Sequence, residues 1–223
     1  MGSIVMTKEI NVPIAQDWLK EFCNAVIGLE DYLNELDAAV GDGEHGSNIS
    51  TGARTLLEEF KSSHHEELGD FFEFVGMTII NSVGGASGAL YGTFFLRLSD
   101  ITANKSSADL AVITDAFTSG LQGIMELGGV KPGDKTLVDA LEPAVSSLVV
   151  SVKNSDDLLQ AFSKAHYAAE FGCAATAQME ARKGRGSYQG QRSVGHIDPG
   201  ATSMAALVRT FSQAIATDRS PIA

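Results

Sequence analysis

The sequence predicts an all-α fold, organised as a single-domain bundle of about eight helices. Apolar residues recur at helical spacing along most of the chain, and the β-branched runs typical of strands are scarce. Aromatic residues make up only 7% of a chain rich in alanine, glycine, leucine and valine, which favours close-packed helices over a β-sandwich. The 223 residues suffice for one large core and no linker divides them. Residues 1–223 are therefore expected to form one domain, with 1–13 as a loosely ordered N-terminal extension.

The N-terminal half carries the first five predicted helices. The first covers residues 14–27, where Trp18, Phe22 and Val26 recur on one face. Shorter helical patterns follow over 31–40 and 49–60. The apolar stretch 67–83 predicts a helix that ends at glycines, and 89–101 predicts the next one.

Three longer helices and a final one are predicted in the C-terminal half. The helix over 107–129 is expected to begin at the cap Ser107 and to stop at two glycines. In the helix over 135–152, Pro143 is expected to produce a kink. Ser155 is expected to cap the following helix, and residues 200–217 form the last one.

Glycines gather between the predicted helices, at 41–46, 84–88, 128–133, 184–190 and 195–200. Alternate loops of an antiparallel bundle lie at the same end, because each helix reverses the direction of the chain. Several of these loops are therefore expected to form the rim of one pocket, built largely from backbone.

The charge balance restricts the classes of partner. The net charge is −12, so neither nucleic acid nor an anionic membrane is an expected partner. No apolar run reaches the roughly 18 residues of a membrane span, and the N-terminus lacks the features of a signal peptide. A cytoplasmic location is expected, with Cys23 and Cys173 as buried, reduced thiols.

The segment GDGEHG at 41–46 matches the glycine spacing of a dinucleotide-binding turn, but the residues before it are helical rather than extended. Three acids accompany these glycines: Asp37, Asp42 and Glu44. Mg²⁺ prefers carboxylate oxygens and is usually held jointly by a few carboxylates and substrate phosphates. The acids are therefore candidate metal ligands that bridge to a pyrophosphate; a solvated acidic turn is the alternative.

Two further loops are candidates for contact with a nucleotide. GGVKPGDKT at 128–136 departs from a phosphate-binding loop, because Asp134 precedes the lysine and the segment lies between helices. Thr136 and nearby N–H groups at a helix N-terminus could still face a nucleotide. SVGGASGALYG at 82–92 exposes amides near Ser87 that suit an anion, although small residues also permit a close helix crossing.

The fourth segment, 181–203, concentrates cations in an acidic chain. Arg182, Lys183, Arg185 and Arg192 are interrupted by glycines, so they do not form a simple helix face. Arginine side chains suit phosphate oxygens. At the end of this segment, Asp198 and Pro199 mark the start of the last helix.

Together and in this order, GDGEHGSN, SVGGASGALYGTFF, KPGDKTLVDALEP and ARKGRGSYQGQRSVGHIDPGATS closely resemble the nucleotide-binding L subunit of dihydroxyacetone kinases. A similar domain forms the C-terminal half of single-chain, ATP-dependent dihydroxyacetone kinases. The resemblance covers about residues 15 to 215. It implies a barrel of eight antiparallel helices, with ADP or ATP held at one end.

The resemblance also implies residue roles. Asp37, Asp42 and Glu44 match the positions of three aspartates that hold two Mg²⁺ ions. The positions that match nucleotide contacts are His45, Gly46, Ser47, Asn48, Ala86, Ser87, Gly128, Thr136, Leu137, Arg185, Asp198, Pro199 and Gly200. Arg185 among them matches a phosphate-binding arginine.

The activity that the resemblance implies is phosphotransfer to dihydroxyacetone or a similar small ketose. The ketose is held by a separate K subunit, so activity is expected only with that partner. Transfer then depends on positioning by metal and nucleotide, with no catalytic residue of this chain. Either ATP or a phosphotransferase-system protein supplies the phosphoryl group. The alternatives are a non-catalytic regulatory homologue and a kinase for another small ketose.

Glu44 departs from the family pattern, since aspartate is usual at the third metal position. We expect Glu44→Asp to keep or raise activity with the K subunit, because Mg²⁺ tolerates little departure from octahedral geometry and the shorter side chain restores the usual reach. Nucleotide titration and a coupled kinase assay measure this. Total loss of nucleotide binding in the variant would contradict it.

Overall fold

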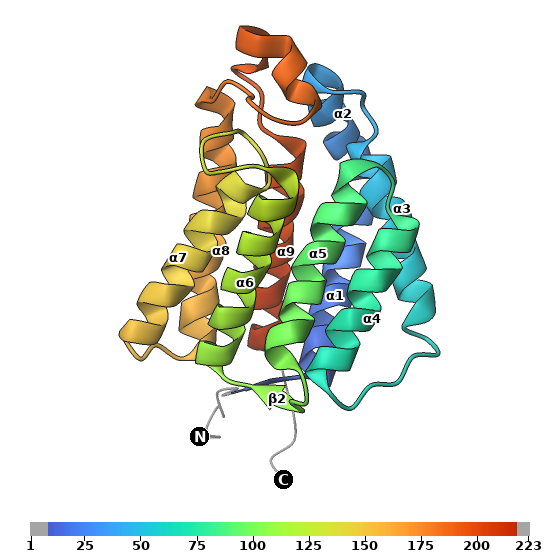
Figure 1. Ribbon diagram of the computed structural model, residues 1–223, viewed down its shortest axis with the longest axis vertical. Coiled ribbons are helices and arrows are strands. Elements are labelled where there is room, and N and C mark those ends of the chain that lie inside the picture. Colours follow the sequence, from blue (N-terminus) through green and yellow to red (C-terminus); the bar gives the residue numbers. More distant parts are fainter. Residues whose placement is uncertain (1–8, 218–223) are drawn as a thin grey trace.

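The computed structural model describes residues 9–217 and shows a barrel of helices (Figure 1). Eight helices form a closed ring in which each packs against its two neighbours. In ring order these are α1 (Val12–Gly28), α3 (His45–Glu59), α4 (Leu68–Ser82), α5 (Gly85–Thr102), α6 (Leu110–Gly128), α7 (Val138–Lys153), α8 (Leu158–Ala175) and α9 (Pro199–Thr217). Since α9 packs against α1, the ring is closed. The predicted all-α, single-barrel fold class is confirmed.

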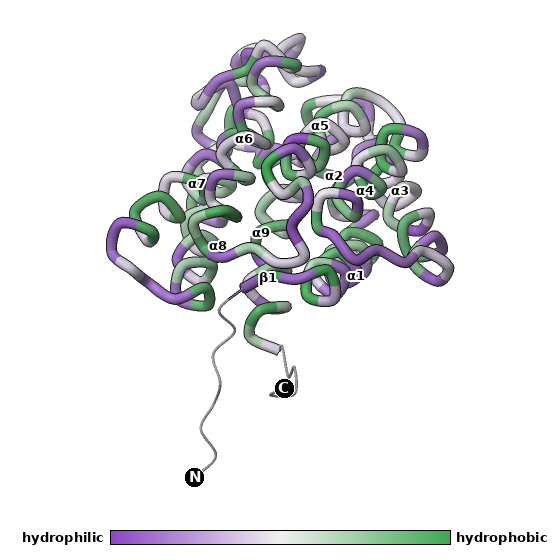
Figure 2. Tube along the Cα trace, turned by 60° about the horizontal axis from the view of Figure 1, so that its bottom comes forward, coloured by the Kyte–Doolittle hydropathy of each residue, from purple (hydrophilic) through white to green (hydrophobic). Residues whose placement is uncertain are grey.

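Neighbouring helices of the ring run antiparallel, and this separates two ends of the barrel (Figure 1). One end holds α2 (Glu30–Val40) and the 3-10 segments η1 (Thr176–Gln178) and η2 (Arg185–Ser193). At the other end, the strands β1 (Ile10–Asn11) and β2 (Ser107–Ala108) pair antiparallel. Figure 2, turned so that this strand end comes forward, shows α9 between α8 and α1. We call the first end the loop end.

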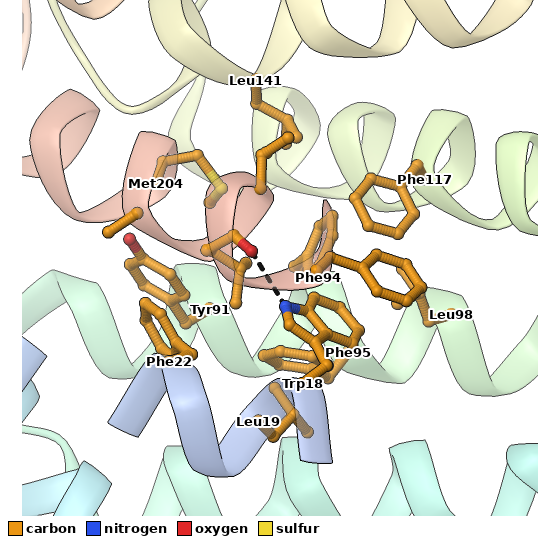
Figure 3. Close-up of a cluster of buried hydrophobic side chains, with 14 of the residues drawn as sticks. Trp18, Leu19, Phe22, Tyr91, Phe94, Phe95, Leu98, Phe117, Leu141 and Met204 are labelled. Carbon is orange, nitrogen blue, oxygen red and sulfur yellow. Dashed lines mark hydrogen bonds between the residues drawn. The ribbon is translucent and has the colours of Figure 1, made fainter. Parts of the chain in front are cut away.

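Aromatic side chains fill the barrel around Trp18 of α1. Its ring stacks on Phe211 of α9 with centroids 4.1 Å apart, and its indole N–H donates to the carbonyl of Leu207 at 2.9 Å. Figure 3 shows Trp18 with this hydrogen bond, and Phe95 and Phe117 close to it. A buried indole needs such a partner for its N–H, and here the partner belongs to the helix that closes the ring.

Two predicted helix starts are wrong by two residues. A cap has an extended backbone and directly precedes its helix. Ser107 lies in the strand pair and is not next to α6, and Ser155 adopts a left-handed conformation with φ 56°. Asp109 and Asp157 instead cap α6 and α8, and each side chain accepts a hydrogen bond from the N–H three residues later. A short polar side chain does cap each of these helices, but it belongs to an aspartate two residues after the predicted serine.

The expected N-terminal extension differs from the structure in its last residues. Residues 1–8 lie outside the described part of the chain, whereas Ile10–Asn11 form β1 and Val12 begins α1. Asn11 is held by two interactions, because it caps α1 and pairs with β2.

Both cysteines are buried, as expected. Among residues 9–217, none of the helices combines the length and apolar character needed to cross a bilayer.

Pro143 lies inside α7 at a place where α8 approaches closely. Proline has no N–H to donate to the carbonyl four residues earlier, which belongs to Asp139. Gly172 of α8 packs against this carbonyl, and a Cβ at Gly172 would lie 2.2 Å from its oxygen. The crossing of α7 and α8 therefore requires glycine at this position.

We expect Gly172→Ala to lower the free energy of unfolding by about 1–3 kcal/mol, because the added methyl forces α8 away from α7. Gly28→Ala is the matched control, since nothing lies within 4 Å of a Cβ at that helix end. The control should be neutral or slightly stabilising. Urea unfolding measures both; equal stability of the two variants would contradict the close crossing.

Candidate functional site

A cavity of about 450 Å³ opens at the loop end of the barrel. Each of the five glycine-containing segments predicted from the sequence contributes to its wall. They supply Asp42, Gly84, Gly128, Gly184 and Gly200, among others. Ring closure therefore brings together loops that are far apart in the sequence. We call this space the loop-end cavity.

One side of the loop-end cavity carries two acids. Asp37, in the last turn of α2, is only 9% exposed and accepts hydrogen bonds from the N–H groups of Glu44 at 2.9 Å and His45 at 3.2 Å. A Cβ at Gly41 would lie 2.2 Å from Asp37 Oδ1, so glycine at this position leaves the carboxylate where it accepts these two bonds. Burial, together with the nearby Asp42, raises the pKa of Asp37.

Asp42 forms an ion pair with Arg185, with 2.6 Å between Oδ2 and Nη1. Although desolvation acts in the opposite direction, the hydrogen bond with Asp37 and the charge of Arg185 hold the pKa of Asp42 below its usual value. Arg185 begins η2, so this pair ties η2 to the acidic turn. A phosphate-binding candidate and a metal-binding candidate are thus in direct contact.

Two of the three acids that were predicted to bind Mg²⁺ are placed together in the cavity. Asp37 and Asp42 both line the cavity, but Glu44 is exposed and does not. In the described part of the chain, no group of three or more His, Cys, Asp or Glu side chains is arranged to hold a metal ion. Protein sites for Mg²⁺ often use one or two carboxylates and leave the other positions to water and substrate phosphates. The Asp37–Asp42 pair suits such an ion.

His45 lies between two serines at the base of the cavity. Its Nδ1 is 3.3 Å from Ser87 Oγ and its Nε2 is 2.9 Å from Ser203 Oγ. Burial lowers the pKa of His45 to about 4, so the ring is neutral near pH 7. Both ring nitrogens are already engaged within the protein, which makes His45 an orienting group rather than a proton carrier.

The N-terminus of α5 faces the same cavity. Residues 84–87 line it, and the first N–H groups of a helix have no partner within the helix. Such groups bind anions well. Gly84 is packed against Asn48, because a Cβ there would lie 2.5 Å from the amide oxygen of that side chain. The 84–87 amides are therefore held next to α3.

The loop that resembles a phosphate-binding loop has another role. Lys135 is almost fully buried, and its Nζ donates to the carbonyls of Met179 at 3.0 Å and Ser193 at 2.5 Å. The Thr136 N–H donates to the Asp139 carboxylate at 2.7 Å. Thr136 lines the cavity, but its N–H is already used. This loop fastens the 179–193 segment to α7, which agrees with the rejection of a phosphate-binding loop.

The cavity also has an apolar wall, formed by Leu90, Leu127, Val130 and Leu137. Leu127 is 56% exposed and so offers apolar surface to a ligand in the cavity. Of these four residues, only Leu137 was predicted from the sequence, because apolar residues near helix ends resemble ordinary core positions. Such a wall suits a planar base or another apolar ligand group.

A family model described as the DAK2 domain matches residues 39–213. The chain belongs to this family. The ADP-binding subunit DhaL of a PEP-dependent dihydroxyacetone kinase from Escherichia coli K12 is 38% identical over 199 residues, which are 89% of this chain and 94% of the relative. A Listeria innocua subunit described in the same way is 38% identical over 196 residues, or 88% of this chain and 93% of the relative.

A solved structure supports the same assignment. The dihydroxyacetone kinase from C. freundii, solved in complex with AMP-PNP and Mg²⁺, matches with a TM-score of 0.69 and 27% identity. The match covers 96% of this chain but only 36% of that longer chain.

Most predicted site residues of this DAK2 domain meet in the loop-end cavity. Those that line it are Asp37, Asp42, His45, Asn48, Ala86, Ser87, Gly128, Thr136, Leu137, Arg185, Asp198, Pro199 and Gly200. Besides Glu44, Gly46 and Ser47 lie outside it. A Cβ at Gly46 would lie 2.0 Å from the Glu30 carbonyl, and Ser47 exchanges two hydrogen bonds with Asn34. Both residues pack α3 against α2.

Asp198 caps α9 and has an unusual protonation equilibrium. Its Oδ2 accepts the Ala201 N–H at 2.7 Å. Burial, with a smaller contribution from Asp139, raises the pKa of Asp198 from 3.8 to about 7. The fold therefore favours the protonated form, so this stabilisation is complete below about pH 4 and is lost as the pH rises to 7.

Asp198→Asn tests this equilibrium, because asparagine also caps helices but does not titrate. We expect the wild type to lose stability relative to the variant as the pH rises from about 4 to 7, and the difference to level off above that range. Urea unfolding of both proteins at several pH values measures it. A difference in stability that stays constant over this range would contradict the raised pKa.

Proposed function

We propose that this DAK2 domain binds ADP or ATP with Mg²⁺ in the loop-end cavity, as the nucleotide-carrying subunit of a kinase for dihydroxyacetone or a similar small ketose. One observation carries this proposal: two adjacent carboxylates, an arginine and the N-terminus of α5 line a single cavity. Groups for a cation and for an anion are thus combined. The DhaL relatives, described as ADP-binding subunits, support it.

In this proposal, different residues bind the metal ion, the phosphates and the base of the nucleotide. Asp37 and Asp42 hold Mg²⁺, two ions by resemblance to the family, and the cation neutralises phosphate charge. Arg185 and the amides of 84–87 bind phosphate oxygens. The apolar wall at Leu127 and Leu137 covers the base. These groups fix the position of the terminal phosphate, and positioning with charge stabilisation is most of what phosphoryl transfer requires.

The acceptor is proposed to come from a separate K subunit, so the chain is active only with that partner. A second cavity of this chain measures only about 10 Å³ and has an apolar lining, which does not suit a ketose.

The Lactococcus lactis relative, 34% identical, is described as an ADP-binding subunit of a PTS-dependent kinase. That description favours a phosphotransferase-system protein over free ATP as the phosphoryl donor. Such a kinase would act in the cytoplasm.

The position of Glu44 favours a second candidate, a non-catalytic regulatory homologue. Glu44 lies outside the cavity, which leaves two carboxylates where the family uses three acids. A regulatory homologue of this kind would bind nucleotide weakly or without a metal requirement.

Calorimetric titration of ADP and ATP, with Mg²⁺ and with EDTA, distinguishes the kinase subunit from the regulatory homologue. Metal-dependent binding, and kinase activity that needs the K subunit, support the kinase; activity of this chain alone would overturn the partner requirement.

Arg185→Ala is expected to weaken binding of ADP with Mg²⁺ by about 10- to 100-fold, because hydrogen bonds to charged groups contribute about 1.5–3 kcal/mol. Arg182→Ala is the control for charge, since Arg182 belongs to the same segment but does not line the cavity. The control should bind nearly as tightly as the wild type. Equal losses in the two variants would indicate only a general effect of charge.

A further inference from the structure

A cluster of hydrogen bonds joins α9 to the base of the loop-end cavity. At its centre is Ser203, which is 0% exposed. The Ser203 Oγ lies 2.9 Å from His45 Nε2 and 2.8 Å from the Tyr91 hydroxyl, and it donates to the Gly200 carbonyl at 3.1 Å. Ser203 does not line the cavity itself.

The number of protons in this cluster sets the direction of each hydrogen bond. A serine hydroxyl has one proton and two lone pairs. A carbonyl can only accept, so all three contacts are satisfied as hydrogen bonds when the Ser203 proton goes to Gly200 and its lone pairs accept from Tyr91 and from the Nε2–H of His45. A neutral imidazole with its proton on Nε2 has an acceptor at Nδ1. Nδ1 therefore accepts the hydroxyl proton of Ser87, at 3.3 Å.

This arrangement determines what Ser87 offers to a ligand. Its only proton is directed to His45, so its lone pairs remain for the cavity. A lone pair binds a ribose hydroxyl or a cation, but not a phosphate oxygen. The amides of 84–87 stay available as anion donors. The anion donors of this turn are then its backbone amides, as the sequence suggested, and not the Ser87 hydroxyl.

We propose that Ser203 is a positioning residue of the nucleotide site, acting through His45 on Ser87. The inference rests on the proposed nucleotide-binding function and adds a residue to it. Without Ser203, the Nε2–H has no acceptor, and the ring of His45 is free to change tautomer or to rotate. Ser87 then loses its fixed direction, although neither it nor His45 has been replaced.

The first test is the affinity for ADP with Mg²⁺ of Ser203→Ala, measured by calorimetry. We expect binding about five- to tenfold weaker than in the wild type, the size of one or two lost hydrogen bonds. Ser50→Ala is the matched control. Ser50 is also a fully buried helical serine, and it donates to the Val26 carbonyl at 3.2 Å, but it lies outside the cavity. The control should bind ADP within twofold of the wild type, or about 0.4 kcal/mol.

A double-mutant cycle distinguishes positioning from plain packing. If Ser203 acts through His45 on Ser87, then Ser203→Ala should have little further effect in a Ser87→Ala background. The same fold-loss in both backgrounds would overturn the proposal. Tyr91→Phe is a milder second variant, because it removes one donor to Ser203 and leaves the other bonds. Its affinity should fall less than that of Ser203→Ala.

A spectroscopic readout covers the case in which affinity alone is ambiguous. Nitrogen-15 shifts of the His45 ring report which nitrogen carries the proton. We expect the Nε2–H form in the wild type and in Ser50→Ala, and a mixture of tautomers in Ser203→Ala. A wild-type ring protonated on Nδ1 would overturn the inference. If the wild type binds no ADP, the proposed function fails. The nitrogen-15 shifts still test whether Ser203 fixes the tautomer of His45.

Discussion

The contact between the first and last helices of the ring is the interaction on which the rest of the structure depends. Trp18 stacks on Phe211, and its indole N–H bonds to the Leu207 carbonyl. These contacts join α1 to α9 and convert a row of antiparallel helices into a closed barrel. A closed ring leaves no helix with an unpacked flank, and each helix buries its apolar stripe inside.

Closure also explains why the functional groups meet at one end. The five glycine-containing segments belong to four connections between long helices, and all of them reach the loop end, since every second connection of an antiparallel ring lies there. Lys135 bonds to the carbonyls of Met179 and Ser193, which fixes the segment between α8 and α9, and Asp139 bonds to the Thr136 N–H before α7. Glycines and other small residues make up much of the cavity lining, and a few side chains, among them Asp37, Asp42 and Arg185, carry its charge.

The acids of this site have different tasks, although they look alike in the sequence. Asp37 accepts two backbone N–H groups and shapes the turn that carries Asp42. Asp42 is the acid that meets Arg185. Asp139 and Asp198 use their carboxylates to cap backbone N–H groups. The first two line the cavity side by side, and they are the pair proposed to hold a cation.

The sequence by itself determined the helices, since the spacing of apolar residues is a local property that the barrel only reinforces. It also identified the glycine-containing loops and, through their resemblance to a family, half of the residues that line the cavity. Only the tertiary structure placed Glu44 outside the cavity and joined Ser203 to His45, 158 positions earlier. The physical reason is that a hydrogen-bond partner depends on where the ring closes, and apolar periodicity holds no information about that.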